Sequence, residues 1–134
     1  MKVDGRCLCG FLLYEADVDE TSVTICNCTD CQIHSGSAFR VTVPAKAQTL
    51  KFLSGKPKTY VKTSESGNTR ALGFCPECGT PIFSKPGDGK VGFFGLRVGP
   101  LRQRDSLIPV VQIWCRSAQS WTGNIKAISK SEIE

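Results

Sequence analysis

Hydrophobic and polar residues alternate with a period close to two along most of this chain. Successive side chains of a β-strand point to opposite faces of the sheet, so this period predicts strands rather than helices. β-branched and aromatic residues, which favour strands, are frequent in the same segments. The predicted strands are residues 39–43, 50–53, 59–63, 91–96 and 108–115.

Turn-forming residues separate these segments. Glycine, proline, serine and asparagine gather at residues 54–57, 66–68 and 86–89, where the chain is expected to reverse. Such a succession of short strands and turns predicts an all-β fold built from antiparallel hairpins. One convincing helical turn covers residues 29–34, with Thr29 or Asp30 as its N-cap. Residues 125–134 give no clear pattern and are expected to be poorly ordered.

The length of 134 residues allows one domain with a hydrophobic core and is short for two. Hydrophobic residues make up 40% and charged residues 22%, as in ordinary soluble domains. The net charge is +5, but lysine and arginine are scattered and form no basic run typical of nucleic-acid-binding arms. We therefore expect no nucleic-acid partner, and the mild positive charge is compatible with a small anionic ligand.

The first residues lack the basic start, apolar stretch and small-residue cleavage site of a signal peptide. Apolar runs such as residues 11–14 are far shorter than the ~20 residues that cross a bilayer. We therefore expect a cytoplasmic protein with no membrane partner, in a compartment that keeps thiols reduced. Under these conditions the eight cysteines are expected to be metal ligands or reactive thiols, not disulfides.

Two cysteine pairs have the spacing of a structural zinc site. Cys75 and Cys78 form a zinc knuckle, in which Gly79 permits the positive φ that the turn needs. Cys7 and Cys9 are two residues apart between glycines, so their side chains share one face of a strand end. Four thiolates complete the tetrahedral coordination of Zn²⁺, and such a site stabilises the fold directly. We predict a structural zinc site on these four residues, called the quartet below.

A third group, Cys26, Cys28 and Cys31, has no evident fourth ligand and is called the trio below. Three protein ligands with one exchangeable position are typical of catalytic zinc. Three thiolates leave the zinc with one net negative charge, so it is a weak Lewis acid toward water but still binds another soft thiolate. The trio residues are therefore the predicted catalytic residues, holding a more labile zinc at which a substrate thiol becomes a nucleophile.

The sequence leaves other assignments of the cysteines open. The knuckle could pair with two members of the trio, and His34 could close a Cys₃His site. The three thiols could form a redox switch by disulfide exchange. Cys115 could be the fourth ligand of the trio, although a cysteine beside Trp114 in an apolar strand is more often a small buried hydrophobic residue.

The order of these motifs resembles the glutathione-dependent formaldehyde-activating enzyme family, whose domain is shared with centromere protein V. The matching segments are Gly-x-Cys-x-Cys-Gly at 5–10, Cys-x-Cys-x-x-Cys at 26–31 with Ser-Gly-Ser-Ala-Phe behind it, Phe-Cys-x-x-Cys-Gly-Thr-Pro at 74–81, and Ile113-Trp114 followed by Ser117-Ala118 and Trp121. The resemblance covers about residues 5–121. It therefore predicts a single domain over 1–134 with residues 122–134 as a tail.

The resemblance implies an Mss4-like fold, in which antiparallel β-sheets pack around a zinc-binding centre with little helix. It implies structural zinc on the quartet and labile, catalytic zinc on the trio. It also implies a carbon–sulfur lyase that condenses glutathione with formaldehyde to S-hydroxymethylglutathione, so the expected partners are a small thiol and a small aldehyde.

This sequence departs from the family pattern in two places that concern the substrate. Residues 32–34 follow the trio where family members often carry a basic residue. Arg102 and Arg104 stand where the family often has an aspartate-containing turn, and there they could meet a carboxylate of a substrate other than glutathione.

The alternative function is a zinc-stabilised module that binds a thiol or a protein without turnover. A methionine sulfoxide reductase that uses Cys115 is disfavoured by the Cys-x-Cys spacing of the first pair. A nucleic-acid zinc ribbon is disfavoured by Glu77, an acid inside the knuckle. The sequence predicts no particular oligomeric state.

Overall fold

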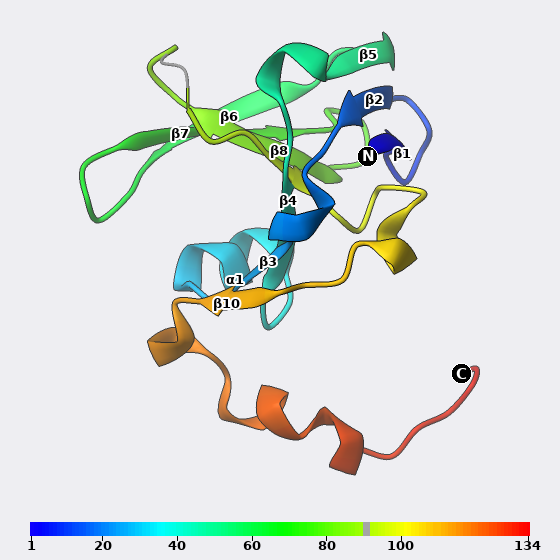
Figure 1. Ribbon diagram of the computed structural model, residues 1–134, viewed down its shortest axis with the longest axis vertical. Helices are drawn as coiled ribbons and strands as arrows, with labels where there is room; N and C mark the ends of the chain where they lie inside the picture. Colours follow the sequence, from blue (N-terminus) through cyan, green and yellow to red (C-terminus); the bar gives the residue numbers. More distant parts are fainter. Residues whose placement is uncertain (90–91) are drawn as a thin grey trace.

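The computed structural model describes residues 1–89 and 92–134, and in this part of the chain it consists of β-strands, one α-helix and short 3₁₀ helices (Figure 1). The predicted all-β class is confirmed. The strands are β1 (Lys2–Arg6), β2 (Leu13–Asp17), β3 (Thr24–Cys26), β4 (Arg40–Pro44), β5 (Lys51–Ser54), β6 (Lys58–Thr63), β7 (Thr69–Phe74), β8 (Pro81–Pro86), β9 (Gly95–Arg97) and β10 (Val111–Ile113). The helices are α1 (Thr29–Ser35), η1 (Glu20–Ser22), η2 (Ala47–Thr49), η3 (Arg104–Ser106), η4 (Cys115–Ser117) and η5 (Ser120–Ala127).

The strands form two sheets. One has the order β1-β2-β5 and the other the order β10-β3-β4-β9-β8-β7-β6. Nearly all neighbours are antiparallel, as predicted, but β10 pairs with β3 in parallel. This exception arises because β10 follows β3 by a long crossover and not by a hairpin. In Figure 1 the three-stranded sheet and α1 lie at opposite ends of the body of the molecule.

The predicted strands agree with the structure to different degrees. Residues 39–43, 50–53 and 59–63 correspond closely to β4, β5 and β6. The prediction for 108–115 is too long, because only Val111–Ile113 pair with β3 and Trp114 has a left-handed backbone, with φ of 55°. Of the predicted strand at 91–96, residue 91 lies outside the described residues, and β9 begins at Gly95.

One cluster of buried side chains joins the two sheets. Tyr14 of β2 packs on Phe52 of β5 with ring centroids 5.6 Å apart, and Phe52 packs on Phe83 of β8 at 6.3 Å. Aromatic contacts of this kind add to the free energy gained by burying the rings. The most deeply buried members of the cluster are Leu12, Tyr14, Val23, Val43, Ile82, Leu96, Leu101, Leu107 and two cysteines, Cys7 and Cys75.

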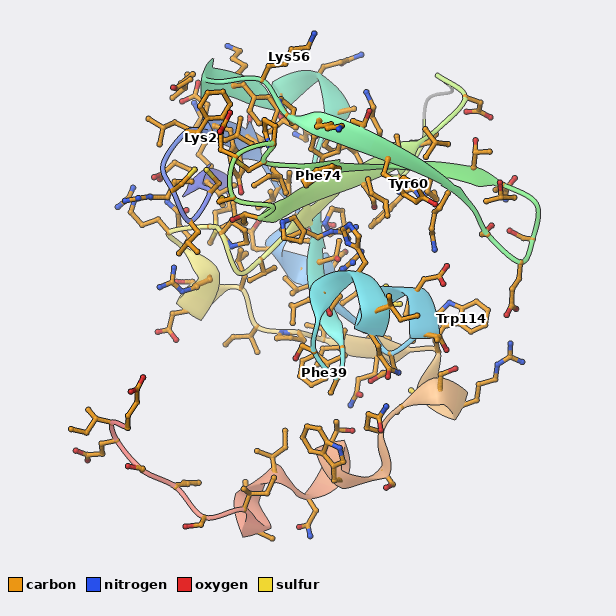
Figure 2. All side chains as sticks on the ribbon, turned by 180° about the vertical axis from the view of Figure 1, so that it is seen from behind. Lys2, Phe39, Lys56, Tyr60, Phe74 and Trp114 are labelled. Carbon is orange, nitrogen blue, oxygen red and sulfur yellow. The ribbon has the colours of Figure 1, made fainter. Side chains whose placement is uncertain are left out.

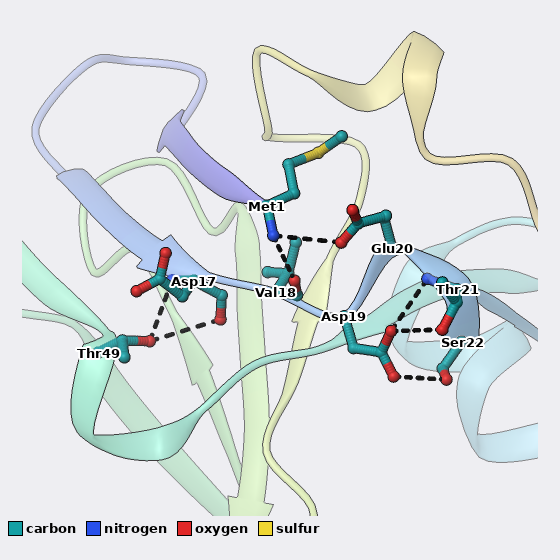
Figure 3. A network of polar contacts seen from close by, with 8 residues as sticks. All are labelled: Met1, Asp17, Val18, Asp19, Glu20, Thr21, Ser22 and Thr49. Atoms are coloured by element: carbon teal, nitrogen blue, oxygen red, sulfur yellow. Dashed lines mark hydrogen bonds and ion pairs between the residues drawn. The ribbon is translucent and has the colours of Figure 1, made fainter.

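Polar contacts fix the exit of β2 from the three-stranded sheet (Figure 3). The Met1 ammonium donates to the Val18 carbonyl at 2.9 Å and pairs with Glu20 at 3.1 Å. Asp19 accepts from the Thr21 amide at 3.0 Å and so caps η1. These contacts set where the chain leaves β2 and enters β3, the strand that ends at the trio.

Residues 108–134 contain no buried side chain. In Figure 1 the segment after η4 runs away from the body. It contains η5, so it is not without structure, but the placement of the domain boundary near residue 121 stays a prediction. In the parts of the chain that the structure describes, no helix is long and apolar enough to cross a membrane.

Candidate functional site

The quartet forms where two strand ends meet. Cys7 and Cys9 follow β1, and Cys75 and Cys78 lie in the turn that joins β7 to β8. The four sulfur atoms all lie within 4.8 Å of one another. Gly79 has the predicted positive φ, at 78°. The structure therefore brings together the four residues that the sequence assigns to one site.

The spacing of the quartet sulfurs fits a tetrahedral metal. Bonds of about 2.3 Å around tetrahedral zinc place neighbouring sulfurs about 3.8 Å apart. The Sγ atoms of Cys7 and Cys9 are 3.6 Å apart, and those of Cys9 and Cys75 are 3.8 Å apart. The Leu12 amide also donates to Cys7 Sγ at 3.2 Å, which stabilises negative charge on that sulfur.

Thr80 links the two halves of the quartet. Its hydroxyl oxygen accepts from the Leu8 amide at 3.0 Å and lies 3.1 Å from Cys78 Sγ. The hydrogen bond from Thr80 lowers the pKa of Cys78 to about 5. This effect favours the thiolate form of Cys78, which is the form that binds a metal.

The trio forms around the start of α1. Cys26 ends β3, Cys28 is the N-cap of α1, and Cys31 lies in its first turn. The three sulfurs lie within 4.8 Å of one another. The Cys31 amide donates to Cys28 Sγ at 3.3 Å. The prediction that Thr29 or Asp30 caps the helix is wrong, because the cap position is taken by Cys28.

The three trio thiols differ in acidity. A hydrogen bond from Cys31 lowers the pKa of Cys26, and the same bond, together with burial, raises the pKa of Cys31. Burial raises the pKa of Cys28. Since metal ligands bind as thiolates, a metal has to displace protons from Cys28 and Cys31.

Among the described residues, neither His34 nor Cys115 completes the trio as a fourth ligand. No nitrogen of His34 and no sulfur of Cys115 lies in the group of close ligand atoms that the three trio sulfurs form. His34 Nδ1 instead accepts from Arg40 Nη2 at 2.5 Å, and burial together with the charge of Arg40 lowers the pKa of His34 to about 4. Cys115 is exposed and its thiol donates to the Gln112 carbonyl at 3.6 Å. The interpretation of Cys115 as a buried hydrophobic residue is wrong, because Cys115 follows the paired part of β10.

Cys28 opens onto a cavity of about 680 Å³. Charges of both signs line it and are paired: Lys62 with Asp30 at 2.6 Å, and Arg116 with Glu65 at 3.5 Å. Trp114 closes one side, and Figure 2 shows its ring beside α1. The Arg116 guanidinium lies over this ring at 4.9 Å, which holds both side chains at the cavity.

The arginines of the 102–104 segment do not line the Cys28 cavity. Arg102 pairs with Asp4, with its Nη2 2.7 Å from Oδ1, and this pair holds the pKa of Asp4 at about 2. Arg104 lines a different cavity together with Arg40 and Arg97. Sequence reasoning misses Arg40 and Arg97, because arginines in a strand are normally exposed.

The order and geometry of the cysteine groups are typical of one protein family. The family model of the glutathione-dependent formaldehyde-activating enzyme matches residues 2–117. The chain belongs to this family. The resemblance found in the sequence is thereby confirmed over nearly the whole chain.

Two known proteins are similar to this chain. A Schizosaccharomyces pombe protein named as an uncharacterised lyase is 28% identical over 91 residues, which cover 68% of this chain and 63% of that protein. The chain thus aligns with less than two thirds of this relative. The crystal structure of a Rhodobacter sphaeroides protein superposes with a TM-score of 0.62 and 21% identity over 84% of this chain and 99% of that one. At this identity the second likeness shows the fold alone.

Proposed function

We propose that this member of the family is a zinc-dependent carbon–sulfur lyase that adds a glutathione-like thiol to formaldehyde or another small aldehyde. The observation that carries the proposal is a trio of close sulfurs that has no fourth ligand among the residues the structure describes, and whose Cys28 lines a cavity. Family membership supports the class of reaction.

Two zinc ions fit the donor sets. The quartet supplies four thiols for a closed structural site, and the trio supplies three thiols for an open site. When bound to the trio, zinc lowers the pKa of a substrate thiol and fixes the position of its sulfur. Cys26, Cys28 and Cys31 would hold the metal, and α1 fixes the last two relative to each other through the cap hydrogen bond.

The Cys28 cavity matches a zwitterionic thiol. Arg116 is available to a carboxylate, and Glu65 is available to an ammonium group. A glutathione-like peptide carries both kinds of charge, so it can exchange the Arg116–Glu65 pair for pairs with itself, while Lys62 stays paired with Asp30. Exchange of existing pairs also limits the cost of removing charges from water.

The proposed reaction needs no oxidant or reductant. A bond forms between the thiol sulfur and the carbonyl carbon, the C=O double bond becomes single, and the proton lost from sulfur ends on the oxygen. Negative charge develops on that oxygen before it is protonated. We assign Lys62, a cation that lines the cavity together with Cys28, as the donor that stabilises this charge.

Two-dimensional exchange NMR of a glutathione–formaldehyde mixture tests the proposal. We expect the zinc-loaded protein to accelerate exchange between free and S-hydroxymethyl glutathione, and we expect Cys28→Ser to abolish the acceleration. The uncatalysed mixture and a Cys115→Ser variant are the controls, because Cys115 lies outside the trio. Binding of glutathione without acceleration by a protein with two zinc ions per chain would instead support a thiol-binding module.

A further inference from the structure

Two arginines are buried beside the trio. Arg40 and Arg97 are each only 7% exposed, a burial that is rare for arginine. They come from neighbouring strands: Arg40 of β4 is paired with Cys26 of β3, and Arg97 of β9 is paired with Thr42 of β4. Both side chains therefore lie on the sheet face that also carries the Cys26 thiol.

The buried guanidinium groups have donors without acceptors. A guanidinium carries five N–H donors. Arg97 Nη1 donates to the Thr42 hydroxyl at 3.0 Å and Arg40 Nη2 to His34, but the Nε atoms of both arginines have no partner among the described residues. A buried donor of a charged group without an acceptor is costly, so such groups mark places where an acceptor binds.

Both arginines line a cavity of about 780 Å³ whose other charged residues are also arginines, Arg6 and Arg104. No aspartate or glutamate is among the described residues that line it. The two further arginines are exposed at the rim, where each reaches a backbone carbonyl at 3.4 Å. Four positive charges thus face one space, two of them deep and two at its edge.

The charges of this cavity act on one another. Burial and the charge of Arg40 lower the pKa of Arg97 to about 9. The trio thiolates partly compensate, since Cys26 and Cys31 act on Arg97 in the opposite direction. With zinc bound, however, the trio carries one net negative charge against four arginines. The cavity therefore retains an excess of positive charge, which favours binding of an anion.

We propose that this cavity binds a small organic anion with two or more carboxylate groups, at a site separate from the Cys28 cavity in which the thiol is proposed to bind. Carboxylate oxygens accept two parallel hydrogen bonds from a guanidinium, as the free Nε donors require. Leu8, Phe39 and Pro81 give the cavity an apolar part, which suits a carbon skeleton better than inorganic phosphate. In the described part of the chain, no residue lines both this cavity and the Cys28 cavity, so the site goes beyond the proposed function.

Titration calorimetry with tricarballylate, a tricarboxylate without a thiol, tests the proposal on the full zinc-loaded chain. We expect binding that Arg104→Gln weakens about threefold to tenfold, as for a partly exposed charge pair. Arg102→Gln is the matched control from the same segment, because Arg102 pairs with Asp4 outside this cavity, and its affinity should equal that of wild type. The trimethyl ester of tricarballylate should not bind.

The Arg Nε–H region of an ¹⁵N-correlated NMR spectrum locates the bound anion. We expect tricarballylate to shift the Nε–H signals of Arg40 and Arg97. We expect Arg97→Lys to remain folded but to bind tricarballylate more weakly, because lysine keeps the positive charge but loses the two parallel N–H donors of the guanidinium. Absence of binding at millimolar tricarballylate, or equal losses in Arg102→Gln and Arg104→Gln, would overturn the proposal. Cys28→Ser should still bind tricarballylate, because Cys28 does not line this cavity. Loss of thiol exchange alone would therefore count against the proposed function and not against this site.

Discussion

At the scale of single residues, the groups around the trio are held in place by the protein itself. Lys62 is fixed by Asp30 at 2.6 Å and His34 by Arg40 at 2.5 Å. Groups that are positioned before the substrate arrives do not have to be ordered during the reaction. Lys62 is therefore the residue outside the cysteines whose removal should affect the chemistry most.

Lys62→Met should lower the rate of thiol–formaldehyde exchange about tenfold or more, because the carbonyl oxygen loses its cationic donor. Lys58→Met on the same strand is the matched control and should leave the rate within about twofold, because Lys58 does not line the Cys28 cavity. Asp30→Asn should retain most of the rate, because the amide oxygen of asparagine can still accept a hydrogen bond from the Lys62 ammonium and hold it in place. Equal rates for Lys62→Met and wild type would remove Lys62 from the mechanism.

A second residue-scale prediction concerns packing beside the knuckle. Gly73 of β7 is paired with Phe83 of β8, and a methyl group at residue 73 would overlap the Phe83 ring. Gly73→Ala should lower the free energy of unfolding by about 1–3 kcal/mol, as overpacked cores do. Gly99→Ala, where an added methyl group meets no atom within 4 Å, should stay within about 0.5 kcal/mol of wild type. Urea unfolding of zinc-loaded proteins compares them, and equal midpoints would contradict the packing described.

At the scale of elements, helix α1 combines two tasks. Its N-cap, Cys28, is a proposed metal ligand of the trio, so the residue that begins the helix would also determine where the metal lies. Gly36 ends the helix with φ of 66°, and its amide donates to the Gln32 carbonyl. Gln32 also donates to the carbonyls of Asn27 and Ser117, both at 2.8 Å, which ties α1 to β3 and to the segment after β10.

The double role of Cys28 predicts different results for two substitutions. Cys28→Ser and Cys28→Ala should both lose the metal of the trio. Serine can still accept the Cys31 amide hydrogen bond, whereas alanine cannot, so Cys28→Ala should be less stable than Cys28→Ser by about 1 kcal/mol. Urea unfolding of the two variants, each with the quartet loaded, measures this difference. If the two variants unfold at the same urea concentration, the hydrogen bond between the residue 28 side chain and the Cys31 amide does not stabilise the helix.

The elements also show what the sequence can predict. The knuckle and the trio are predictable because ligand spacing is local, and β4, β5 and β6 because their alternation is regular. The period-two pattern does not reveal β7 and β8, since each strand buries three residues in succession and therefore does not alternate. It also cannot show the parallel pairing of β10 with β3, which depends on contacts far apart in the chain.

At the scale of the whole molecule, the two cysteine groups are predicted to differ in how firmly they hold metal. The quartet is built between β1, β7 and β8, and two of its cysteines belong to the hydrophobic core. The trio cysteines are partly buried, and Cys28 lines a cavity. Residues 108–134 contribute no buried side chain, so stability is expected to depend on the quartet and on the core that surrounds it.

Zinc release to a coloured chelator tests the central claim, an open trio beside a closed quartet, most directly. For wild type we predict two zinc ions per chain, one released fast and one released only as the protein unfolds, and we expect added glutathione to change the rate of the fast phase. Cys28→Ser should lose the fast phase alone and keep its fold. One zinc ion per chain, released in a single phase that Cys28→Ser leaves unchanged, would contradict the account.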